Sequence, residues 1–140
     1  MKLSQVRWGM ALGGAVAAEL VLVAGAFAWV AIYSHLLHPG EALAFYEQYA
    51  LMAAPWVSVI LGIPVFYLAC RWIGSRSPSA AWPTAMAFFG AYLLIDVSFL
   101  VFGENTTVAP WFLVANYLLK FLACHLGGRS AARRTVARPA

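Results

Sequence analysis

Charged residues are scarce in this chain of 140 residues, at 10% of the sequence against 64% hydrophobic residues. A soluble domain carries about a quarter of its residues as charged side chains. The mean hydropathy of +0.80 is also too high for a surface that faces water. The composition therefore excludes an ordinary soluble domain and predicts one domain that lies in a membrane.

The chain also lacks the patterns of common catalytic and cofactor sites. It has no nucleophile elbow, Gly-rich phosphate loop, HExxH motif or paired CxxC motif. We therefore expect neither an enzyme nor a cofactor. Cys70 and Cys124 are expected to be reduced packing residues. His35, His38 and Glu41 supply only three ligands with a turn between them, so we expect no metal site.

Four long apolar stretches account for most of the sequence. A bilayer core about 30 Å thick needs about 20 helical residues, at about 1.5 Å per residue. Each stretch meets this length: they are residues 8–33, 50–72, 82–102 and 108–126. The sequence predicts an all-α integral membrane protein with a four-transmembrane-helix bundle in residues 1–127. Residues 128–140 are expected to form a disordered basic cytoplasmic tail.

Lys and Arg are absent from the first and third connections between these stretches, which contain Glu41, Glu47 and Glu104 instead. Every Lys and Arg except Lys120 lies in the second connection, at the adjoining end of the second stretch (Arg71) or near the two ends of the chain. This asymmetry predicts an inner (cell) membrane protein with both termini in the cytoplasm. The net charge of +4 then reflects topology and not nucleic-acid binding. The tail is expected to bind anionic lipid headgroups.

Three local features refine the predicted bundle. Residues 41–50 follow a Pro-Gly turn and predict a short amphipathic surface helix in the first outer loop. Gly62 and Pro64 lie near the middle of the second stretch and predict a helix kink, because proline lacks the N–H and clashes with the preceding turn. The first stretch has a small-residue side that predicts close helix packing within the bundle. Its members are Ala11, Gly14, Ala15, Ala18 and Gly25.

Ionisable and polar residues inside the apolar stretches are the candidates for function. Counted from the cytoplasmic ends at about 1.5 Å per residue, Glu19 lies about 16 Å deep and Asp96 about 21 Å. On the same count Asn116 lies about 15 Å deep and Lys120 about 9 Å, one turn apart on one helix face. Charges at this depth are costly, so they should face the bundle interior. We expect Glu19 and Asp96 as a proton or cation site, supported by Tyr92, Asn116 and Lys120.

Two interpretations of these charges stay open. In the first, one acid pairs with Lys120 while the other is protonated near neutral pH, which makes a proton or cation site. In the second, Lys120 extends its stem to the cytoplasmic boundary. Glu19 and Asp96 are then neutral acids whose hydrogen bonds hold the helices together. For Lys120 alone we favour the extended position.

The segment Gly13-Gly14-Ala15-Val16-Ala17-Ala18-Glu19 resembles the first helix of the small multidrug resistance transporters. In that family of four-helix proteins, a membrane-embedded glutamate exchanges protons for cationic drugs. The resemblance implies this role for Glu19. It covers only this segment, and the chain differs from the family in its long outer loop, its basic tail and its additional Asp96 and Lys120.

Two functions follow as hypotheses. The first is a small proton- or cation-coupled transporter or channel that acts as a homo-oligomer, with Glu19 and Asp96 as titrating sites. The second is a non-catalytic accessory or assembly subunit of a larger membrane complex, with purely structural acids. A transporter needs the two acids on an open cavity, whereas an accessory subunit needs them sealed between helices.

Overall fold

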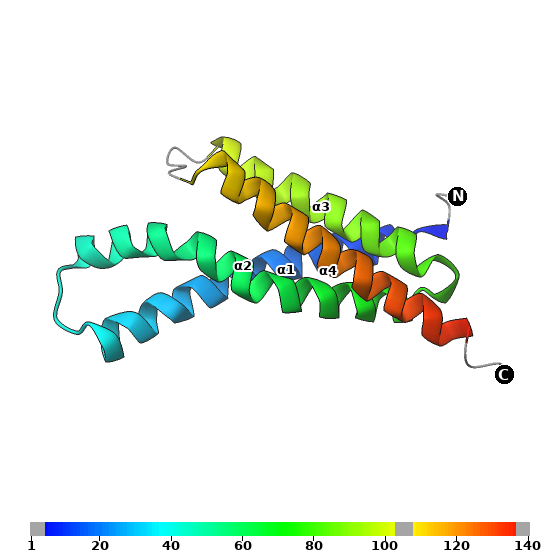
Figure 1. The fold of residues 1–140 in the computed structure, drawn as a ribbon, viewed down its shortest axis with the longest axis horizontal. Coiled ribbons are helices and arrows are strands. Elements are labelled where there is room, and N and C mark those ends of the chain that lie inside the picture. Colours follow the sequence, from blue (N-terminus) through cyan, green and yellow to red (C-terminus); the bar gives the residue numbers. More distant parts are fainter. Residues whose placement is uncertain (1–4, 103–107, 137–140) are drawn as a thin grey trace.

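The computed structural model describes residues 5–102 and 108–136, which form an all-α four-helix bundle (Figure 1). Its long helices are α1 (Trp8–Ile32), α2 (Leu43–Ser75), α3 (Ala81–Phe102) and α4 (Pro110–Val136). A short π-helix, η2 (Tyr33–Leu37), continues α1, and a 3-10 turn, η3 (Pro78–Ala80), leads into α3. The predicted fold class of an all-α four-helix bundle is confirmed.

Within the described residues, three segments are long and apolar enough to cross a membrane: Trp8–Leu37, Leu43–Ser75 and Pro78–Val101. Large apolar side chains cover the outside of these helices, including Leu20 at 64% exposed and Ile60 at 71% exposed. A water-soluble bundle would place polar residues on that surface. The chain is therefore a multi-pass membrane protein by length and composition.

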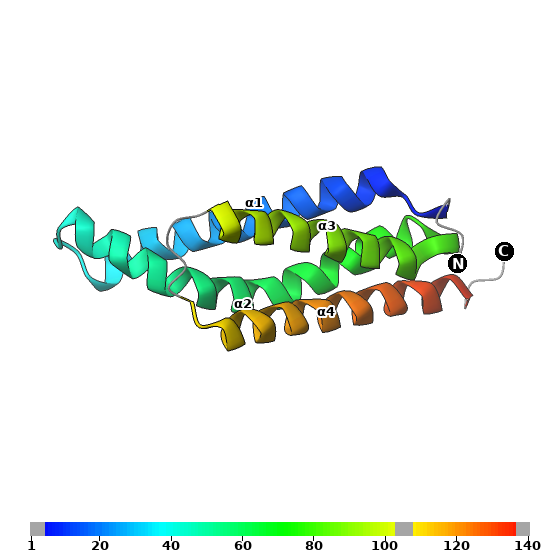
Figure 2. The same ribbon diagram turned by 90° about the horizontal axis from the view of Figure 1, so that it is seen from above.

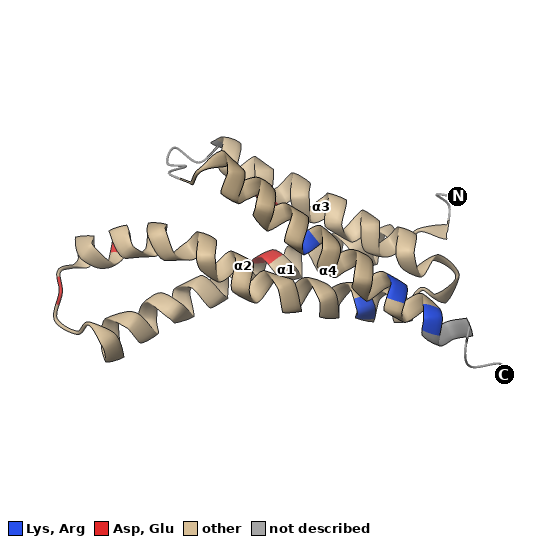
Figure 3. Cartoon of the chain, in the orientation of Figure 1, with Lys and Arg blue, Asp and Glu red and all other residues tan. Residues whose placement is uncertain are grey.

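Helices that are consecutive in the sequence run in opposite directions, so the start of α1 and the end of α4 lie at the same end of the bundle (Figures 1 and 2). The connection between α2 and α3 lies at this end too, and the Arg7 guanidinium donates to the carbonyl oxygen of Arg76 at 2.6 Å. Basic residues gather at this end, while acidic residues mark the connection between α1 and α2 at the opposite end (Figure 3). The charge asymmetry of the sequence is thus also an asymmetry of the fold.

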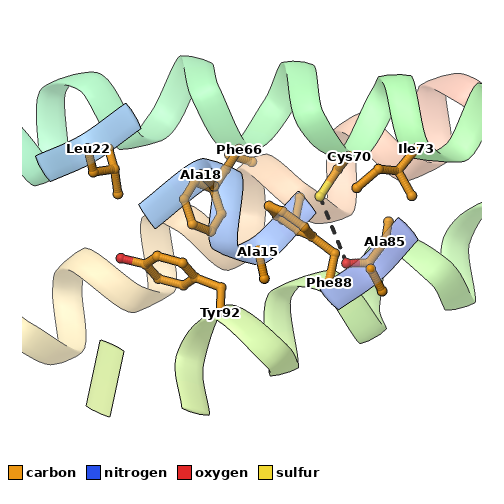
Figure 4. Close-up of a cluster of buried hydrophobic side chains, with 12 residues drawn as sticks. Ala15, Ala18, Leu22, Phe66, Cys70, Ile73, Ala85, Phe88 and Tyr92 are labelled. Carbon is orange, nitrogen blue, oxygen red and sulfur yellow. Dashed lines mark hydrogen bonds between the residues drawn. The ribbon is translucent and has the colours of Figure 1, made fainter. Parts of the chain in front are cut away.

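The core lies in the half of the bundle nearer the termini. Figure 4 shows its buried side chains between the helices. The ring of Phe66 on α2 makes T-shaped contacts with Phe88 and Tyr92 on α3, at centroid distances of 5.4 and 4.5 Å. The small side chains of Ala15 and Ala18 on α1 are buried in the same cluster. A Cβ added to Gly14 would lie 2.9 Å from the Ile73 side chain. The predicted small-residue packing of α1 within the bundle is confirmed.

The expected surface helix over residues 41–50 is wrong as a separate element. These residues from Leu43 onward belong to α2, which continues to Ser75. Good helix formers such as Leu, Ala, Glu, Gln and Met supply this extension without an interruption. In this extension the ring of Tyr49 stacks on the ring of Tyr33, with 3.7 Å between the ring centroids. The Tyr49 hydroxyl also accepts a hydrogen bond from the indole N–H of Trp29, so the extension is held against α1.

The fourth helix is also longer than predicted. Residues 128–136, expected to be disordered tail, continue α4 as far as Val136. Ala131 is 2% exposed and packs against Gly74 of α2. The glycine leaves room for this contact, because a Cβ added to Gly74 would lie 2.7 Å from the Ala131 Cβ. This contact orders the helix beyond the predicted boundary. Residues 137–140 of the expected tail lie outside the described residues.

Candidate functional site

A cavity of about 600 Å³ lies between the helices and extends toward the connection between α1 and α2. All four long helices line it, and α3 and α4 diverge from α1 and α2 on this side (Figure 1). Most of the lining side chains are apolar. The polar ones near mid-helix are Glu19, Ser58, Tyr92, Asp96 and Asn116. The structure therefore brings both predicted acids, Tyr92 and Asn116 to one cavity.

Lys120 lies behind this polar set and does not reach the membrane boundary. Its side chain is 0% exposed, so the expectation that it extends to the cytoplasmic surface is wrong. The ammonium donates hydrogen bonds of 2.8 Å to the hydroxyls of Ser58 and Tyr92. It also lies 4.9 Å from the centroid of the Tyr92 ring and 5.5 Å from that of Phe66. The expected carboxylate partner of Lys120 is replaced by two hydroxyls and two ring faces.

Gly62 explains how a lysine fits there. A Cβ at Gly62 would lie 2.6 Å from the Lys120 Cε, so the stem of Lys120 crosses α2 directly over this glycine. The ammonium then reaches Ser58, which lies one helical turn away on the same face of α2. Gly62 thus serves as a packing site for Lys120. The kink predicted at Gly62 and Pro64 stays a prediction, since α2 continues as one helix through Pro64.

Asp96 is held by a tyrosine. The Tyr117 hydroxyl of α4 donates a hydrogen bond of 2.6 Å to one of its carboxylate oxygens. The Tyr92 hydroxyl lies one turn earlier on α3 and accepts a hydrogen bond from Lys120.

Glu19 and Asn116 are the incompletely bonded members of the set. Glu19 is close enough to Asp96 and Lys120 to interact electrostatically with both. Its Oε2 atom is buried without a hydrogen-bond partner, and so is the Oδ1 atom of Asn116. Buried acceptors are rarely left unpaired, because the lost hydrogen bonds to water are not replaced. Both residues line the cavity, so a partner from outside the chain can reach them there.

Sequence reasoning missed Ser58 and Tyr117 as members of the site. Both carry hydroxyls within apolar helices at depths that overlap those of the acids, and this was the available signal. A hydroxyl side chain costs little free energy in an apolar membrane helix, so its presence alone does not indicate whether it faces the bundle interior or the lipid.

No known protein family, curated protein or solved structure matches this chain. The resemblance of the first helix to the small multidrug resistance transporters therefore has no support from a family match. Within that segment Gly13 lies on the open outer side of α1, while Ala15 and Ala18 are buried. The function has to be argued from the geometry of the chain's own residues.

The remaining candidate ligands do not assemble into a metal centre in the described part of the chain. No group of three or more His, Cys, Asp and Glu side chains converges among those residues. His35 contacts the carbonyl oxygen of Ala31 through Nδ1, and His38 stacks on Tyr33. Cys70 and Cys124 are both buried free thiols. These residues are therefore occupied by local packing.

Proposed function

We propose that this protein is a small proton- or cation-coupled transporter of the inner membrane that acts as a homo-oligomer and has no enzymatic activity. The observation that carries the proposal is the position of the two acids. Glu19 and Asp96 line one cavity of about 600 Å³. An accessory subunit that used these acids only as structural hydrogen-bonding groups would have them sealed between helices.

The balance of charges in the site also supports binding of a proton or cation. The site contains two carboxyl groups and one ammonium, Lys120, whose hydrogen bonds go to hydroxyls. In a low-dielectric interior, two carboxylates near one cation favour binding of a further proton or cation. Phe66, Phe88 and Tyr92 are fully buried on the side of the site nearer the termini. Transport therefore requires these packed rings to move, as in alternating access.

The proposed role of Glu19 and Asp96 in transport is tested by measuring proton flux in vesicles that contain the purified protein and a pH-sensitive dye. Glu19→Gln and Asp96→Asn keep the size of the side chain and remove the titrating group. We expect each to lower the flux to the level of empty vesicles, with normal helix content. The matched control is Glu41→Gln, because Glu41 is exposed and lies outside the cavity lining. Unchanged flux in both acid variants would contradict the proposal and favour the accessory subunit.

In this proposal α4 is a fourth membrane-spanning helix. Its one intramembrane charge, Lys120, is hidden from lipid, so the outer face of the helix is apolar. The exposed side chains on that face include Trp111, Val114, Leu118, Leu122 and Leu126. The end of the bundle that contains both ends of the described chain is then cytoplasmic. Arg129 and Arg133 are exposed there and are suited to contact anionic lipid headgroups.

Reporter fusions test this orientation. A fusion after Thr107 is expected to read periplasmic or luminal, and a fusion after Arg138 is expected to read cytoplasmic. The physical reason is that basic residues are retained on the cytoplasmic side during insertion. Opposite readings, or equal signals from the two fusions, would overturn the orientation.

A further inference from the structure

The charges that line the cavity are all of one sign. Among the residues that the structure describes, its lining includes Glu19, Asp96 and Glu47, and it includes no Lys, Arg or His. Glu47 is exposed and lies early in α2, toward the connection between α1 and α2. A cleft with negative charges and low-dielectric walls raises the local concentration of cations, because the walls focus the electric field. The cavity therefore favours a positively charged occupant.

Asp96 of α3 and Asn116 of α4 lie at the same level at the inner end of the cavity. The Lys120 ammonium of α4 donates to the Tyr92 hydroxyl of α3, which sets the register of the two helices. They run in opposite directions (Figure 2), and Asp96 lies one turn after Tyr92 while Asn116 lies one turn before Lys120. The neighbour of Asn116, Tyr117, donates to Asp96, which agrees with this register. Both side chains line the cavity.

Oxygen atoms at this end have lone pairs available. The Oε2 atom of Glu19 and the Oδ1 atom of Asn116 are buried without a hydrogen-bond partner, and Asn116 is only 6% exposed. Donors are also present nearby, namely the third N–H of Lys120, the amide N–H groups of Asn116 and the hydroxyl hydrogens of Ser58 and Tyr92. A carboxylate has about four lone-pair sites and an amide oxygen about two, so lone pairs remain even when all these donors are engaged. A cation binds to lone pairs and leaves those donors free to form their hydrogen bonds.

The charge of the site favours one monovalent cation. Glu19 is close enough to Asp96 and Lys120 to interact electrostatically with both. Two carboxylates and one ammonium leave a net negative charge, which is costly in a low-dielectric interior. One monovalent cation makes this cluster neutral, whereas a divalent cation would make it positive. A proton on one acid gives the same neutrality, so a proton and a monovalent cation compete for the site.

The ligand types identify the cation further. Carboxylate, amide and hydroxyl oxygens are the ligands of hard cations, which excludes a soft metal ion. Sodium is smaller than potassium and is coordinated by fewer oxygen atoms, which suits a site built from a few side chains.

We propose that the inner end of the cavity binds one sodium ion through carboxylate oxygens of Glu19 and Asp96 and the Oδ1 atom of Asn116, with the Ser58 hydroxyl and water as further ligands. The inference rests on the proposed function and deepens it by naming the coupled ion. It depends on Asp96 and Asn116, which lie outside the segment that resembles the small multidrug resistance transporters.

The test is binding of radioactive sodium to the purified full chain in detergent, in a mildly alkaline buffer that limits competition by protons. We expect saturable binding that unlabelled sodium displaces at a concentration at least about tenfold lower than potassium requires. Glu19→Gln and Asp96→Asn should each weaken binding at least about tenfold, because a charged ligand is lost. Asn116→Leu removes the amide oxygen at similar size and should also weaken it, with Asn116→Ala as the replacement if the leucine variant does not fold. Glu41→Gln is the matched control and should bind sodium as the parent does, since Glu41 lies outside the cavity lining.

Four results would overturn the inference. They are no saturable sodium binding by the folded parent, equal displacement by potassium, stronger displacement by magnesium or calcium, and parent-like binding in both acid variants. Sodium binding without ion flux in vesicles would retain the site and reject the transporter. Proton flux that is the same in sodium and potassium buffers, without sodium binding, would retain the transporter and reject sodium as its coupled ion.

Discussion

Gly127→Ala is expected to destabilise the bundle strongly, because this glycine lies where α4 touches the backbone of α2. An added Cβ would lie 2.4 Å from the carbonyl oxygen of Tyr67 and 3.1 Å from the amide nitrogen of Arg71. Neither atom belongs to a side chain that can rotate away, so the two helices must separate. Overpacking of this kind costs about 1–3 kcal/mol when side chains can adjust, and more when they cannot.

The effect is large in a membrane because packing, and not the hydrophobic effect, holds the helices together. The measurement is the free energy of unfolding in mixed detergent micelles as the fraction of denaturing detergent rises. Gly13→Ala is the matched control, since an added Cβ there meets no atom within 4 Å. Alanine is the better helix former by about 1 kcal/mol, so this variant should be as stable as the parent or more stable. Similar losses in both variants would contradict the close approach of α4 to α2.

The example of Gly127 also shows which parts of the fold the sequence could predict. Length and apolarity were enough for four helices, because each stretch had to satisfy its backbone hydrogen bonds internally. The end of the fourth helix was placed too early, at Leu126. A Gly-Gly pair usually favours the end of a helix, but here Gly127 faces α2 and Gly128 faces Ala85 of α3. The tertiary contacts of the pair override its local preference.

The candidate site was predictable in depth but not in its partners. Counting residues from the helix ends placed Glu19, Asp96 and Asn116 at overlapping depths, and the structure brings them to one cavity. The rotation of each helix about its axis was not predictable, because lipid and protein interior are both apolar and leave little inside-outside periodicity. The hydrogen bonds of Lys120 and Tyr117 depend on that rotation.

The interpretation of Lys120 changes most between sequence and structure. At about 9 Å from the boundary, the lysine stem is long enough to reach the surface, and this favoured an extended side chain. In the structure the ammonium turns inward to Ser58 and Tyr92 because Gly62 opens a path across α2. The absence of a Cβ on a neighbouring helix is a tertiary property, and no pattern within the fourth stretch indicates it.

Lys120→Glu is accordingly expected to prevent folding of most of the protein, and Lys120→Met to destabilise it moderately. Methionine keeps an unbranched stem over Gly62 but loses two hydrogen bonds, at a cost of about 1–3 kcal/mol. Glutamate removes the same bonds and adds a third acid to a site that already contains Glu19 and Asp96. An uncompensated buried charge of this kind costs about 3–5 kcal/mol.

The measurement is the same detergent unfolding, with the yield of monodisperse protein as a second readout. Arg129→Met and Arg129→Glu are the controls, because Arg129 is an exposed basic residue on the same helix. Parent-like stability of Lys120→Met would show that the buried hydrogen bonds of Lys120 do not stabilise the bundle, and the lysine would then have to be placed back at the membrane surface.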